Sequence, residues 1–172
     1  MTTDALPTGD VHDFDFLTGR WRVHNRRLMT RLRDANDWTE FEGSSWCEPR
    51  LHGGANVDQI DFPSLGFSGL TVRSFDVERR RWAIYWINSR DGLLGEPVRG
   101  GFKGERGEFY GVDTDQGREV QVRFVWLRLG PNSARWEQAF SFDGGATYAT
   151  NWVMQLSRSE PAHAERGERE QQ

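Results

Sequence analysis

Apolar and polar residues alternate along most of the chain, in short segments that are rich in β-branched and aromatic residues. Gly, Asp, Asn and Pro separate these segments, and this combination is typical of strands joined by turns. The pattern predicts ten strands, over residues 19–32, 38–48, 54–60, 67–75, 81–89, 98–104, 107–113, 118–129, 134–142 and 147–158. Residues 10–17, "DVHDFDFL", are predicted to form a short helix that plugs one end of the sheet.

Ten antiparallel strands in an open sheet would leave two exposed edges, whereas closure into a barrel removes them. Short turns between successive strands favour an up-and-down order. A barrel of about ten strands is too wide for its own side chains to fill, so a ligand cavity is expected in its lumen. The predicted fold class is therefore an all-β, roughly ten-stranded antiparallel up-and-down barrel.

The chain of 172 residues is expected to form one domain, over residues 10–158. Residues 159–172 contain no Val, Ile, Leu, Met, Phe, Trp or Tyr. Because such a segment has nothing to bury, it is predicted to be disordered, and residues 1–9 are predicted to be disordered too.

Composition excludes several classes of protein. The net charge of −4 argues against a nucleic-acid-binding surface. No apolar segment approaches the roughly 20 residues of a membrane helix, and the N-terminus lacks the basic and apolar regions of a signal peptide. A cytoplasmic protein without membrane association is expected. Cys47 is the only cysteine, which excludes an intramolecular disulfide.

Gly19 and Trp21, at the start of the first predicted strand, form a Gly-x-Trp motif that resembles the signature of the calycin superfamily, which includes lipocalins and fatty-acid-binding proteins. In that superfamily the Trp closes the base of the barrel, and an Arg or Lys near the end of the last strand packs across it. The resemblance implies this structural role for Trp21 and Arg158.

A longer pattern is similar to a group of bacterial calycin-like proteins of unknown function. Over residues 12–158 it comprises the segments "FDFLTGRWRV", "GFSGLTVRSFD", "RRWAIYWINSRDG", "VRFVW" and "RWEQAFSFDGGATYATNWV". This resemblance implies the calycin-like fold. It implies no particular ligand or reaction, because barrels of this class serve as carriers, haem proteins and enzymes.

The first strand places polar residues on the face that its tryptophan predicts to be internal. Asn25 and Arg27 share the parity of Trp21 and Val23. They form a polar patch inside the cavity, aimed at a carbonyl, carboxylate or phosphate, or else the strand kinks or outruns the barrel and both reach water. Burial of an unpaired arginine is costly, which favours the second alternative.

Two further arginines lie within apolar strand segments. Arg73 is flanked by apolar residues in "LTVRSF" and Arg123 in "VQVRFVW". Alternation faces each outward, opposite Val72 or Phe124, and arginines are mostly exposed. If either faces inward, it is a candidate anion-binding residue.

The middle of several strands carries aromatic residues and amides that suit a polar-lined aromatic pocket. Trp86, Trp126, Trp136 and Trp152 are candidate wall residues, although core packing is the commoner role of a strand Trp. Asn88 and Gln138 share the parity of neighbouring tryptophans, so each amide needs a hydrogen-bond partner.

The four histidines, His12, His24, His52 and His163, are poorly placed for haem ligation or catalysis. Acidic residues around His12 have the side-chain types of a metal site, yet they more often cap a helix start. No metal and no cofactor is therefore expected.

The function expected from the sequence is binding of a small, partly apolar ligand that bears a carbonyl or anionic group. The alternatives are a cavity-type isomerase, cyclase or hydratase, and an inert homodimeric barrel. The predicted ligand-binding residues are Asn25, Arg27, Arg73, Trp86, Asn88, Arg123, Trp126, Gln138 and Trp152.

Overall fold

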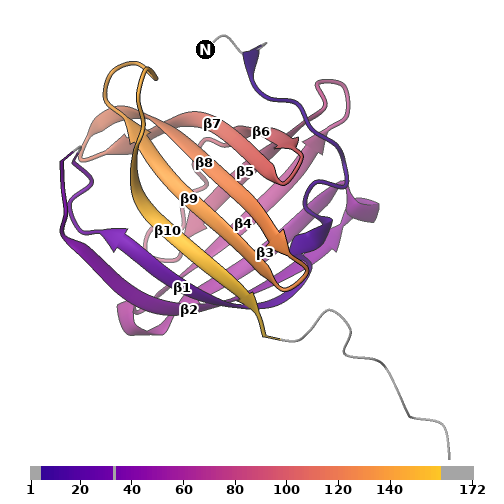
Figure 1. The fold of residues 1–172 in the computed structure, drawn as a ribbon, viewed down its shortest axis with the longest axis horizontal. Helices are drawn as coiled ribbons and strands as arrows, with labels where there is room; N and C mark the ends of the chain where they lie inside the picture. The colour runs from indigo at the N-terminus through magenta and orange to yellow at the C-terminus, as the bar shows by residue number, and fades with distance from the viewer. Residues whose placement is uncertain (1–4, 33, 160–172) are drawn as a thin grey trace, which may run out of the picture.

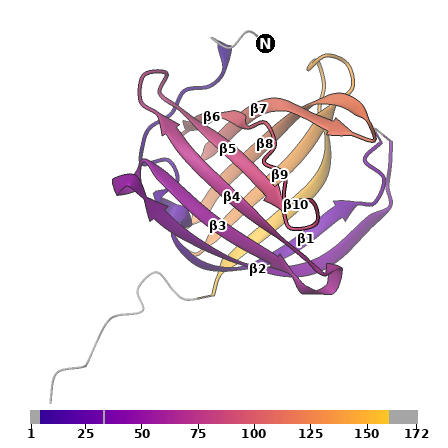
Figure 2. The same ribbon diagram turned by 180° about the vertical axis from the view of Figure 1, so that it is seen from behind.

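Ten strands form one closed barrel in a computed structural model that describes residues 5–32 and 34–159 (Figures 1 and 2). The strands are β1 (Gly19–Leu28), β2 (Trp38–Arg50), β3 (Ala55–Phe62), β4 (Phe67–Asp76), β5 (Arg81–Asn88), β6 (Val98–Lys103), β7 (Arg106–Asp115), β8 (Arg118–Gly130), β9 (Ser133–Ser141) and β10 (Ala149–Arg158). Three short 3₁₀ turns accompany them: η2 (Asp15–Leu17), η3 (Leu51–Gly53) and η4 (Pro63–Leu65).

Each strand pairs antiparallel with the next along the chain, and β1 closes the barrel by pairing with β10. In that closing pair Trp21 lies opposite Arg158 and Arg27 lies opposite Trp152. The predicted ten-stranded antiparallel up-and-down barrel is confirmed. No helix in the described part of the chain has the length and apolarity that crossing a bilayer requires.

Strand boundaries differ from the prediction mainly at the end of β1. This strand ends at Leu28 instead of residue 32, because the chain turns there. The Met29 amide donates to the Asp37 carbonyl at 3.3 Å, and the Thr30 hydroxyl donates to the Asp37 carboxylate at 2.7 Å. Side-chain hydrogen bonds of this kind commonly fix a turn.

The predicted helical plug over residues 10–17 is wrong, because this segment forms turns followed only by the 3₁₀ turn η2. The amides of Asp10 and His12 donate to the carboxylates of Asp13 and Asp10, both at 3.0 Å. Such local side-chain bonds offer the backbone an alternative to the helical ladder. The segment nevertheless covers one end of the barrel.

Hydrogen bonds hold this N-terminal segment across the barrel end, seen in indigo in Figure 1. Trp82 Nε1 donates to the Asp10 carbonyl at 2.9 Å, and the Phe102 amide donates to the Asp13 carboxylate at 3.1 Å. The Gly9 amide donates to the Arg80 carbonyl at 2.7 Å. Gly9 belongs to the segment predicted to be disordered; residues 1–4 and 160–172 of the two predicted tails lie outside the described residues.

Phe14 is the centre of an aromatic core at this covered end. Its ring is 2% exposed and makes edge contacts with Trp82 at 5.2 Å and Phe102 at 5.4 Å between ring centroids. Rings of Trp126 and Phe109 also pack on it. Edge-to-face packing of this kind adds to the stabilisation that burial alone provides.

Trp21 and Arg158 close the base beside this core. The Trp21 indole donates to the Leu17 carbonyl at 2.9 Å, and the Arg158 guanidinium lies 4.2 Å from the centre of the indole ring. The same guanidinium donates to the carbonyls of Phe16, Thr18 and Pro131, at 2.8, 2.6 and 3.1 Å. It therefore ties the N-terminal segment and the β8–β9 turn to the end of β10.

We expect Arg158→Ala to lower the free energy of unfolding by about 2 kcal/mol, because three carbonyls lose a charged donor and the indole loses its cover. Chemical denaturation measures this change. Arg22→Ala is the matched control, since Arg22 is an exposed arginine of the adjoining strand, and it should change stability by less than about 0.5 kcal/mol. Equal effects of the two substitutions would contradict the assigned role.

Candidate ligand-binding cavity

A cavity of about 400 Å³ occupies the lumen, within the roughly 300–1,000 Å³ range of small-molecule sites. It begins at Leu17 beneath the N-terminal segment and extends to the opposite end of the barrel. There it is lined by Arg31 of the β1–β2 loop, by Asp91 and Glu96 of the β5–β6 loop, and by Asp113 near the end of β7. We call this end the mouth; in Figure 1 it lies where the β1–β2 loop approaches the β7–β8 turn.

Aromatic, aliphatic and polar side chains line the cavity. Its rings come from Phe67, Trp86, Phe124, Trp126, Trp136 and Trp152. The Trp136 ring packs edge-on against Phe124 at 4.9 Å and against Trp152 at 5.5 Å between centroids. These three rings thus support one another and form an apolar part of the wall.

Gly69 makes room for Trp86 in this wall. A Cβ atom at Gly69 would lie only 1.7 Å from the Trp86 ring, which is far inside van der Waals contact. Because any side chain at this position of β4 would displace the ring, the Trp86 indole can lie flat against β4 only beside a glycine.

Asn25 supports the wall and does not line the cavity. It is fully buried at 0% exposure, so the alternative in which it reaches water is wrong. The Trp152 indole donates to the Asn25 side-chain oxygen at 3.0 Å, and the Asn25 amide donates to the Val23 carbonyl at 3.2 Å. An amide stands on the inner face of β1 because it holds the indole N–H of the neighbouring strand.

Gln138 lines the cavity and is joined to Asn151, which sequence reasoning missed. Its side-chain amide donates to the Asn151 side-chain oxygen at 2.9 Å. The register of β10 against β9 shifts between Thr150 and Trp152, and this irregularity turns Asn151 to the same side as Trp152. Alternation cannot reveal such a residue, because a bulge breaks the alternation.

Arg27 lies at the mouth, partly buried, with its guanidinium 4.4 Å from the centre of the Trp152 ring. Among the described residues its guanidinium makes no hydrogen bond and no ion pair. Burial, followed by the positive charges of Arg31 and Arg90, lowers the pKa of Arg27. Arg31 lies 2.8 Å from the Asp115 carboxylate, and Arg90 donates to the Leu65 carbonyl at 2.7 Å, so both neighbours already have partners.

Arg73 faces the lumen, which corrects the outward orientation that alternation favours. It is 3% exposed, and its Nη1 lies 2.5 Å from Asp58 Oδ2 and 3.0 Å from Asn56 Oδ1. The guanidinium also lies 5.1 Å from the Phe14 ring centre and 5.5 Å from that of Trp126. The inner face of β4 therefore carries an arginine because β3 supplies Asn56 directly opposite it and the buried Asp58 carboxylate diagonally across.

Asp58 was missed by sequence reasoning, although a signal existed. It shares the parity of Ile60 and Phe62 on β3, both of which are buried. A carboxylate on an apolar face requires a partner. Combined with Arg73 in the next predicted strand, this would have indicated a buried ion pair.

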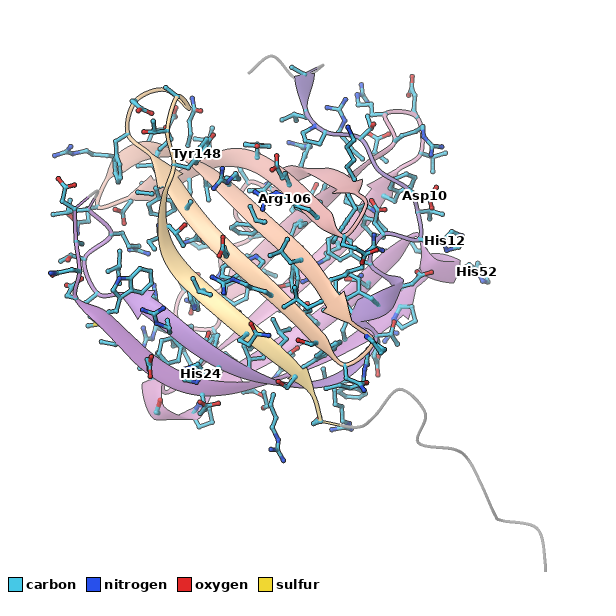
Figure 3. The ribbon with its side chains drawn as sticks, in the orientation of Figure 1. Asp10, His12, His24, His52, Arg106 and Tyr148 are labelled. Carbon is cyan, nitrogen blue, oxygen red and sulfur yellow. The ribbon has the colours of Figure 1, made fainter. Side chains whose placement is uncertain are left out.

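Two other predicted site residues have different surroundings. Arg123 lies outside the barrel, so it does not line the cavity. Its guanidinium is 4.8 Å from the ring centre of Tyr148 in the β9–β10 loop, and Tyr148 is labelled in Figure 3. Asn88 lines the mouth, and its side-chain oxygen accepts a hydrogen bond from the Arg90 amide at 2.9 Å.

The described histidines, His12, His24 and His52, are exposed and lie at the periphery of the barrel in Figure 3. His12 pairs with Asp15 at 2.8 Å and His24 pairs with Glu42 at 2.5 Å. Within residues 5–32 and 34–159, no group of three or more His, Cys, Asp or Glu side chains has a geometry that could hold a metal ion.

Comparison of the chain with models of protein families gives no match, and a search of curated proteins finds no significant relative.

We expect Asp58→Ala to destabilise the fold by about 3–5 kcal/mol, because it leaves the Arg73 charge buried without a counter-ion. The double variant Asp58→Leu/Arg73→Met should recover most of this loss, since two apolar side chains can fill a similar volume. Chemical denaturation of both variants tests the pair. A double variant that is no more stable than Asp58→Ala would show that the two charges do not depend on each other.

Cys47, close to this pair, should be unreactive in the folded protein. Burial raises the pKa of its thiol to about 12, against the opposing effect of the Arg73 charge. At about pH 8 the buried thiol therefore stays protonated, and only the thiolate attacks a disulfide reagent. We expect one thiol to react with Ellman's reagent after unfolding in guanidinium and almost none before. Rapid reaction of the native protein would contradict this.

Proposed function

We propose that the protein binds a small, flat, partly apolar anion in the lumen of its barrel. Arg27 carries this proposal: it is a guanidinium at the edge of an aromatic cavity that lacks an acidic partner among the described residues. A carboxylate or a similar anion would provide the counter-charge, with the planar geometry that arginine matches best.

The positive charges next to Arg27 support an anion over a neutral ligand at this residue. Arg31 and Arg90 repel the charge on Arg27, which is why they lower its pKa. An anion that contacts Arg27 would reduce this repulsion, and its interaction would be stronger than in bulk water because the site is partly buried. Asp91, Glu96 and Asp113 also line the mouth, but all three are exposed.

The wall of the cavity supports an aromatic or conjugated ligand. Rings of Trp86, Trp126, Trp136 and Trp152 face the space that the ligand would occupy. Stacked or edge-on contacts with these rings would supply affinity beyond the burial of apolar surface. Arg27 would then set the direction of the ligand.

The geometry favours binding over the enzyme alternative. An enzyme that uses general acid–base catalysis needs a free acid or base next to the ligand. Asp58 is the buried carboxylate of the lining, and it is already paired with Arg73. The other carboxylates of the lining, Asp91, Glu96 and Asp113, are exposed at the mouth, so the enclosed part of the described lining favours recognition of a ligand over acid–base chemistry.

Calorimetric titration with 2-naphthoate and with its neutral analogue 2-naphthamide tests the proposal. In the wild-type protein the carboxylate should bind more tightly than the amide. Arg27→Gln should weaken carboxylate binding by about 10- to 100-fold, since a charge-assisted hydrogen bond is lost, and should leave amide binding within about threefold.

Arg22→Gln is the matched control, because Arg22 lies on the same strand as Arg27 but on its exposed face. It should leave both affinities unchanged. Failure of both probes to bind, or an equal loss for the two probes in Arg27→Gln, would refute an anion site at Arg27.

A further inference from the structure

We infer that the ligand also carries an uncharged hydrogen-bond acceptor at the end opposite its anionic group, and that this end enters first and lies against Trp126. The inference rests on the proposed function and names the ligand class more closely. A hydroxy- or oxo-substituted aromatic acid is an example of such a molecule. The acidic group would stay at the mouth, on Arg27.

Unsatisfied donors at the covered end are the first observation. Trp126 lines the cavity at 5% exposure, and its Nε1 has no hydrogen-bond partner in the described part of the chain. Arg73 Nε is likewise buried without a partner there. Both groups only donate, and a buried donor without an acceptor costs free energy. Both nitrogens are enclosed, so an acceptor on a ligand would satisfy the Trp126 N–H after a rotation of the indole that turns this N–H toward the lumen.

Their position is the second observation. Trp126 stands in the second half of β8, where its ring packs on Phe14 and Phe16 of the N-terminal segment. The Arg73 guanidinium lies against the Trp126 ring. These donors are thus at the covered end, whereas Arg27 and Arg31 are at the mouth. A ligand long enough to span the cavity would contact both ends.

Charge decides which end of the ligand enters first. Asp58 already neutralises Arg73 at the covered end. A second carboxylate placed there would face the Asp58 carboxylate and lose its hydration, and both effects disfavour it. At the mouth the opposite holds, because Arg27 lacks a carboxylate partner among the described residues. The end of the ligand that carries the neutral acceptor therefore lies at the covered end of the cavity, and the anionic group remains at the mouth.

Two probes of similar size test the inference. In 6-hydroxy-2-naphthoate an acceptor stands at the far end from the carboxylate, and in 6-methyl-2-naphthoate a methyl group replaces it. Calorimetry on the wild-type protein should show about tenfold tighter binding of the hydroxy compound. Trp126→Phe should reduce this preference to less than about twofold, because it removes the N–H and keeps an aromatic ring.

Trp136→Phe is the matched control, because Trp136 lies opposite Trp126 in the β8–β9 register and also lines the cavity. It should weaken both probes while keeping the preference for the hydroxy compound. Thermal unfolding of each variant shows whether it is folded, and the wild-type comparison stands even if Trp126→Phe is not.

The outcomes separate the two proposals. If neither naphthoate binds, the proposed function itself fails. If both bind the wild-type protein equally, or if Trp126→Phe keeps the preference, an anion site at Arg27 stands but the acceptor site at Trp126 is overturned.

Discussion

The pairing of the first strand with the last is the constraint on which the rest of this structure depends. It closes the barrel, and its register sets Trp21 opposite Arg158 at one end and Arg27 opposite Trp152 at the other. Two guanidinium–indole contacts result, at 4.2 and 4.4 Å, on the same pair of strands. The Arg158 guanidinium donates to three backbone carbonyls, whereas the Arg27 guanidinium makes no hydrogen bond among the described residues. The same contact is therefore structural at the base and open to a ligand at the mouth.

The two ends of the lumen differ because only one is covered by the N-terminal segment. Phe14 and Leu17 fill that end, and beside them the Arg73 charge needs a buried counter-ion, which Asp58 supplies. Arg27 at the mouth is only partly buried, so its charge does not require a buried counter-ion. The Arg73 charge is thus paired where desolvation would be most costly, and the Arg27 guanidinium is left without an ion pair at the less buried end. This gradient gives the cavity a direction.

The strands and the closure of the barrel were predictable because alternation and turn residues are local signals. Each strand is long enough for the alternating pattern to be recognised. The absence of a helix over residues 10–17 was not predictable in this way, because the carboxylates of Asp10 and Asp13 accept hydrogen bonds from nearby backbone amides in place of a helical ladder. Alternation also misplaced Arg73, since what draws this side chain inward is Asp58 on the neighbouring strand. Asn151 was hidden by the bulge in β10. The parts of the site that were missed depend on cross-strand partners or on irregular backbone.

Contacts behind the wall hold two of the tryptophan rings in place, and this would affect the affinity for a ligand. The Asn25 side-chain oxygen accepts the hydrogen bond of the Trp152 indole N–H, and Gly69 lets the Trp86 ring pack closely against β4. Rings held in this way lose little further freedom when a ligand arrives, so more of the contact energy appears as affinity. The anion that we propose as the ligand would therefore be selected by its shape as well as by its charge.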